Sequence, residues 1–62
     1  MENTIEIVKQ LKTNDKIVVF SKNISEETIE ELLALGISVC PDTNRNGADV
    51  YIILTPKQWQ NN

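Results

Sequence analysis

The chain has 62 residues with one cysteine and no histidine, and its nine acidic and six basic side chains give a formal net charge of −3. A chain of this length forms one domain, residues 1–62, and buries only about 60% of the surface that it exposes when unfolded. The single Cys40 excludes an intramolecular disulfide, and without histidine the chain lacks a common zinc ligand and the usual base for nucleophilic catalysis. We therefore expect no metal, no cofactor and no enzymatic activity, and stabilisation by assembly into a homo-oligomer, a dimer or larger.

Charge and hydropathy also bear on location and partners. No apolar run approaches the roughly 20 residues that a membrane-spanning helix needs, and the start of the chain does not resemble a secretory signal. We expect a cytoplasmic protein with a reduced thiol and no membrane partner. The acidic balance argues against nucleic acid as a partner, because neutralising phosphates takes clustered Lys and Arg. The abundance of Asn, Ile and Lys is typical of AT-rich genomes, such as those of phages and other mobile elements.

The first third of the chain predicts a helix followed by a strand. Between Asn3 and Thr13 the apolar residues recur on one helical face, so residues 3–13 are expected to form an amphipathic helix. Asn14 and Asp15 end it in a short turn. The run Lys16-Ile17-Val18-Val19-Phe20 is almost uniformly apolar, which is typical of a buried strand. We expect it to be the central strand, with helices covering both of its faces.

The second helix is specified at both ends. Ser25 is the expected N-cap, acids occupy the first turn, and Ile24 is placed to pack against Ile29. Gly36 stands where a left-handed residue ends a helix, and Ile37 can then fold back towards Leu32. The expected buried stripe consists of Thr28, Ile29, Leu32, Leu33 and Leu35.

Two further strands are predicted over residues 37–40 and 50–54, and the stretch between them leaves two topologies open. A two-residue hairpin turn at Asn46-Gly47 would place Pro41 and polar residues opposite an apolar strand. We therefore favour a longer connection, which leads either into a third parallel strand or, nearly as well, into an antiparallel strand after a wide loop. Thr55-Pro56-Lys57-Gln58 then resembles a helix start, whose single turn requires Trp59 to dock.

Together these elements predict the α/β class. The expected architecture is a small single-layer α-β-α-β-β domain whose three-stranded sheet has a parallel β-α-β core and is covered by helices, with the direction of the last strand open. It resembles half of a Rossmann-like sheet in general terms, and that likeness implies no function.

The leading functional hypothesis is a non-enzymatic interaction or regulatory protein, of the kind that phages and mobile elements encode, that acts as a homo-oligomer on an unidentified protein partner. Aromatic anchors are enriched in binding hot spots, and the acidic helix offers a charged face. The candidate contact residues are Tyr51, Trp59, Glu27, Glu30 and Glu31.

Two alternatives come from other classes of function. If the strands are parallel, their carboxyl ends would bring polar side chains to one edge of the sheet, as in small ligand-binding or anion-binding α/β domains. That site would comprise Ser21, Lys22, Asn23, Cys40 and Asp42. The second alternative is a weak nucleic-acid binder that uses the lysines near the first helix and strand. Its residues would be Lys9, Lys12, Lys16 and Lys22.

Overall fold

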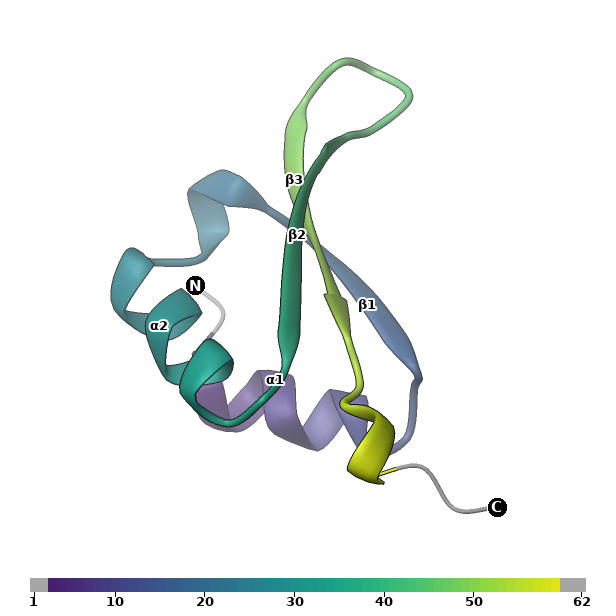
Figure 1. Cartoon of the computed structure of the whole chain (residues 1–62). Coiled ribbons are helices and arrows are strands. Elements are labelled where there is room, and N and C mark those ends of the chain that lie inside the picture. Colours follow the sequence, from purple (N-terminus) through teal and green to yellow (C-terminus); the bar gives the residue numbers. More distant parts are fainter. Residues whose placement is uncertain (1–2, 60–62) are drawn as a thin grey trace.

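The computed structural model describes residues 3–59, which form two α-helices, a three-stranded sheet and two short 3₁₀ turns (Figure 1). In chain order the elements are α1 Thr4–Leu11, β1 Lys16–Phe20, η1 Ser21–Asn23, α2 Glu26–Ala34, β2 Ser38–Thr43, β3 Asp49–Leu54 and η2 Lys57–Trp59. The α/β class and the α-β-α-β-β order are therefore confirmed.

The predicted parallel β-α-β core is wrong. The strand order is β1-β3-β2, and β3 runs antiparallel to both of its neighbours. Strands β1 and β2 point the same way but do not pair, because β3 lies between them in a split β-α-β arrangement. The physical reason lies in composition: Val50 to Leu54 is the most continuous apolar run beside a tight turn, so it takes the position with a neighbour on each side.

The expectation that Lys16–Phe20 forms the central strand is also wrong, since β1 and β2 are the two edges of the sheet. Strand β2 contains Pro41, and proline is tolerated at a sheet edge because its missing N–H can face away from the ladder. The sequence argument against a hairpin treated this proline as a lost ladder donor. On an edge strand that objection disappears.

A short hairpin loop joins β2 to β3, so the antiparallel alternative is right in direction, but the expected longer connection is wrong. Residues 44–48 form the turn, so Pro41 pairs with Tyr51 and Asp42 with Val50. Asn44 stabilises the loop, because its side-chain oxygen accepts hydrogen bonds from the backbone N–H of Asn46 and of Ala48, both at 2.9 Å. Gly47 supplies the required positive φ of 82°.

Helix α2 begins and ends where the sequence predicts. The Ser25 hydroxyl accepts the backbone N–H of Thr28 at 3.1 Å, which confirms the N-cap. Gly36 has a φ of 84°, and the bonds from Gly36 N to Leu33 O and from Ile37 N to Leu32 O, both 3.0 Å, complete a Schellman motif. These signals are local, so they hold in any tertiary context.

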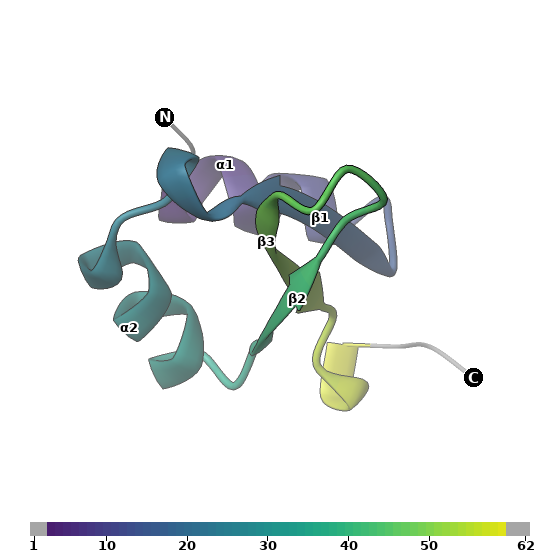
Figure 2. The same cartoon turned by 90° about the horizontal axis from the view of Figure 1, so that it is seen from above.

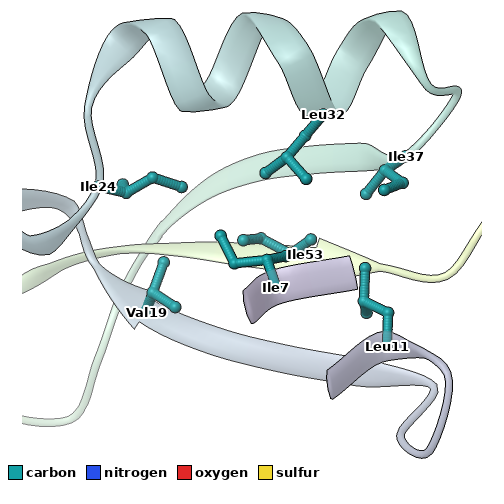
Figure 3. Packing of buried hydrophobic residues seen from close by; sticks show 7 residues of the cluster. All are labelled: Ile7, Leu11, Val19, Ile24, Leu32, Ile37 and Ile53. Carbon is teal, nitrogen blue, oxygen red and sulfur yellow. The ribbon is translucent and has the colours of Figure 1, made fainter. Parts of the chain in front are cut away.

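The core lies between the two helices and one face of the sheet. Leu32 of α2 and Ile53 of β3 are fully buried in it together with Ile7 of α1 (Figure 3). The rest of this cluster is Leu11, Val19, Ile24 and Ile37. The predicted stripe of α2 is correct at Thr28 and Leu32 but not at Leu33 and Leu35, which are 53% and 47% exposed. Both helices pack on the same side of the sheet, and no other element in the described part of the chain covers the side of α2 that carries Leu33 and Leu35.

Thr55 ties the end of β3 to the segment between α1 and β1. Its hydroxyl lies 3.2 Å from the carbonyl oxygen of Leu11 and 3.1 Å from those of Asn14 and Asp15, and its backbone N–H donates to Asp15 O at 3.0 Å. The hydroxyl carries one proton, so it donates to one of these carbonyls at a time, at the end of α1 or in the turn that follows it.

Replacing Thr55 by Val removes this hydroxyl and keeps the shape of the side chain. We expect the free energy of unfolding to fall by about 1–2 kcal/mol, because the carbonyls lose a half-buried donor. Urea titration followed by circular dichroism measures the change. Thr55→Ser is the control and should retain most of the stability. Equal stability of Thr55→Val and the unaltered chain would show that the hydroxyl is dispensable.

Candidate functional site

The two faces of the sheet differ in what covers them. Cross-strand partners point to the same side, so the register places Ile17, Val19, Tyr51, Ile53 and Val39 on the face that packs against α1 and α2. Helices α1 and α2 lie on the same side of the sheet (Figure 2). The other residues of the ladder alternate with those on that side and therefore point to the opposite side. We call this opposite side the open face; its residues are Lys16, Val18, Phe20, Ser38, Cys40, Asp42, Val50, Ile52 and Leu54, of which Val50 is buried (5% exposed) and Ile52 is half-buried.

The centre of the open face is apolar and exposed to solvent. Val18 is 55% exposed, Phe20 44% and Leu54 38%. Val18 pairs with Ile52, and Ile52 pairs in turn with Cys40, so the apolar side chains continue across all three strands. Scattered exposed apolar residues are ordinary on proteins, so it is their contiguity on one sheet face that makes this face the candidate site.

Charged residues occupy two opposite corners of this face. Lys16 on β1 is level with Leu54, at the end of the sheet where β3 finishes. Asp42 on β2 is level with Val50, at the other end. The Lys22 ammonium lies 5.8 Å from the centre of the Phe20 ring, within reach of a cation–π contact. The opposite charges at these two corners would orient a partner on the face.

A groove lies at the foot of the molecule, beside Trp59. It has a volume of about 810 Å³. Its lining comes from α1 and the turn after it, from the C-cap of α2 and from the segment after β3, namely Val8, Leu11, Lys12, Asp15, Leu35, Thr55 and Trp59. Trp59 is half-buried against the core, as its expected docking requires. The groove is separate from the open face.

The predicted contact residues do not lie on one surface. Tyr51 is half-buried on the helix-facing side of the sheet, between Val19 and Pro41, and Trp59 lines the groove. Glu27 and Glu30 are exposed on α2, and the carboxylate of Glu31, also on α2, accepts a hydrogen bond from the Thr4 hydroxyl of α1. The acidic helix and the open face therefore lie on opposite sides of the sheet. The contact roles of these residues stay predictions.

The alternative ligand site required adjacent parallel strands, and β3 separates the two that carry its residues. Ser21, Lys22 and Asn23 follow β1, whereas Cys40 and Asp42 belong to β2 on the far side of β3. Strands β1 and β2 do end at the same end of the sheet, two strand spacings of roughly 5 Å apart. The side chains of Cys40 and Asp42 belong to the open face. A binding role for this group stays a prediction, as does one for the lysines.

Sequence reasoning missed Val18, Phe20 and Leu54 as surface residues, because an apolar run was taken as buried on both sides. A signal was present in the neighbouring strand. Ser38, Cys40 and Asp42 alternate with Val39 and Pro41, which indicates that one face of the sheet meets solvent. Applied to the whole sheet, that alternation would have marked the open face.

In comparisons with known proteins, no protein-family model, no curated protein and no solved structure matches the chain. Within residues 3–59, no helix has the length and apolar character that crossing a membrane demands. Over the same residues, Cys, Asp and Glu side chains form no group of three or more that could hold a metal ion.

Proposed function

We propose that this chain is a small protein-interaction module that acts by binding rather than by catalysis, as a homo-oligomer, and that the open face is its binding surface. The observation that supports this most is the exposure of Val18, Phe20 and Leu54 on one face of a sheet whose other face packs against both helices.

Burial of this face supplies the driving force. Each Å² of apolar surface removed from water contributes roughly 25 cal/mol, and the open face groups aliphatic and aromatic side chains within one small area. The backbone beneath them is already ordered in the β1-β3-β2 ladder. A partner therefore meets a preformed surface and does not have to offset the entropy of ordering it.

The partner is a protein surface of matching chemistry. It carries an apolar centre that covers Val18 and Leu54, an acidic group near Lys16 and a basic group near Asp42. The apolar centre provides affinity, and the two charges at the rim set orientation and the rate of association. The acidic helix α2 points the other way and does not take part in this contact.

Leu54→Glu tests the proposal, because residue 54 is exposed at the end of the central strand and pairs with Lys16. The new carboxylate faces Lys16 across the strands, so the isolated domain should stay folded. In extracts of its own host, we expect the unaltered chain to migrate in a complex well above its 7.0 kDa mass, and Leu54→Glu to lose that complex. Size-exclusion chromatography followed by native mass spectrometry measures both.

Ile5→Glu is the matched control. Ile5 is 68% exposed, lies outside the sheet, and occupies the first turn of α1, where an acid suits the helix dipole. The complex should survive this change. A complex that withstands Leu54→Glu, or that is lost equally in both variants, would contradict the proposed role of the open face.

A further inference from the structure

We propose that two copies of the chain pair along the outer edges of β1, antiparallel and with Val18 opposite Val18 of the second copy, to form one six-stranded sheet. This inference rests on the proposed function, since it names the arrangement in which the module presents its open face.

The backbone groups that point outward from β1 follow from the alternation of an antiparallel ladder. Thr55 N donates to Asp15 O, so the groups of Asp15, Ile17 and Val19 face β3. Those of Lys16, Val18 and Phe20 consequently face outward. Beyond the β1–β3 ladder, the amide and carbonyl of Val18 and the amide of Phe20 take part in no hydrogen bond within residues 3–59. This edge is therefore free to pair.

The opposite edge of the sheet is blocked. Asn44 N donates to Ala48 O, towards β3, so the outward residues of β2 are Val39, Pro41 and Thr43. Pro41 has no N–H, and the N–H of Thr43 is bonded to the Asp42 carboxylate at 2.7 Å. Of the three outward positions, only Val39 keeps a donor for another strand. Such features protect an edge from pairing.

Because one edge of the sheet is free and the other is blocked, each chain can pair with one other copy, which favours a closed dimer. A sheet that is open on one side only cannot extend into a fibre, and two copies related by a two-fold axis satisfy each other completely. A strand from an unrelated protein could also pair with this edge, but β1 of a second copy is complementary to it. Centred on Val18, the register pairs every outward residue with another outward residue.

The side chains on β1 agree with this register. Antiparallel pairing about Val18 places Lys16 opposite Phe20 of the second copy at both ends of the contact. No like charges face each other in this register. The Phe20 ring already has one cation near it, the ammonium of Lys22. The two open faces become continuous, which gives a partner twice the apolar surface.

Charge reversal across this register provides the test. Phe20→Lys places lysine opposite Lys16 at both symmetry-related positions, so we expect the dimer dissociation constant in sedimentation equilibrium to rise at least about tenfold. Lys16→Glu in the same chain should recover about tenfold of that affinity, because opposite charges then face each other. Lys16→Glu alone should change it less than about threefold. Within one copy these positions are four residues apart on one strand, so recovery can only come from the second copy.

A backbone substitution keeps the test valid where a side-chain change disturbs folding. In a chemically synthesised chain, an ester in place of the Val18 amide removes the outward donor and leaves every side chain intact. We expect dimer affinity to fall about tenfold, because two symmetry-related hydrogen bonds are lost. The same ester at Val39, whose amide points outward from the blocked edge, is the matched control and should leave the dimer intact.

The outcomes separate this inference from the proposed function. A chain that is monomeric up to millimolar concentration, or a dimer indifferent to the Val18 ester and not recovered by Lys16→Glu, overturns the β1 pairing. If Leu54→Glu dissociates that dimer while the Val18 ester does not, the copies stack through their open faces, which overturns the pairing and supports the open face. An intact β1 dimer whose host complex withstands Leu54→Glu supports the pairing and contradicts the proposed function.

Discussion

Leu32→Ala is expected to remove a large part of the domain's free energy of unfolding, about 2–5 kcal/mol. Leu32 has no exposed surface and lies where α2 meets Ile7 of α1 and Ile53 of β3 (Figure 3). Truncation of a fully buried leucine costs about 2–5 kcal/mol, because transfer energy is lost and a cavity remains. A 62-residue domain has a total stability of only roughly 3–9 kcal/mol. Urea denaturation followed by circular dichroism measures the loss.

Leu33→Ala is the control for this prediction. Leu33 follows Leu32 in the same helix but is 53% exposed, so we expect a change of less than about 1 kcal/mol. Both substitutions have the same effect on helix propensity, and their difference therefore reports burial alone. A cost for Leu33→Ala as large as that for Leu32→Ala would show that α2 is rotated relative to the sheet.

Ile53→Ala and Ile52→Ala should differ strongly, although the two residues are adjacent and identical. Ile53 is fully buried on the helix-facing side, and we expect its truncation to cost about 3–4 kcal/mol. Ile52 is half-buried on the open face, and its truncation should cost about 1–2 kcal/mol in the isolated chain. Urea denaturation at low protein concentration, where self-association is weak, measures both.

This pair tests the one-sidedness of the sheet directly. The substitutions share the strand and the loss of β propensity, so their difference reports which face is covered. Equal costs at low concentration would mean that both faces are covered in the single chain, and the open face would not exist. If the cost of Ile52→Ala grows when the host partner is added, while that of Ile53→Ala does not, the open face is the surface that binds.

Features that depend on nearby residues were predicted correctly from the sequence. The cap at Ser25 and the left-handed residue at Gly36 each involve atoms a few residues apart, so the chain specifies them before it folds. The buried side of α1 was likewise visible, because Ile7 and Leu11 repeat at helical spacing. On α2 the predicted buried stripe included too many residues, because Leu33 and Leu35 fit the helical spacing but are exposed in the structure.

The order of the strands was not accessible in this way. Whether Lys16–Phe20 lies at the centre or the edge depends on which strand it pairs with, and hydrophobicity alone does not distinguish a strand buried on both faces from an apolar strand with one open face. For the same reason the candidate site could not be predicted from the sequence. Val18 and Phe20 resemble core residues until the register shows that both helices lie on the other side.

By itself, the sequence determined the class of the domain, its helices and caps, and the strand segments, because each of these follows from residue spacing and from contacts within a few positions. Only the tertiary structure decided that β3 inserts between β1 and β2, that both helices pack on one face, and that the opposite face stays open. Those outcomes depend on competition among long-range pairings, in which the most apolar strand takes the centre and two short helices can cover one side only.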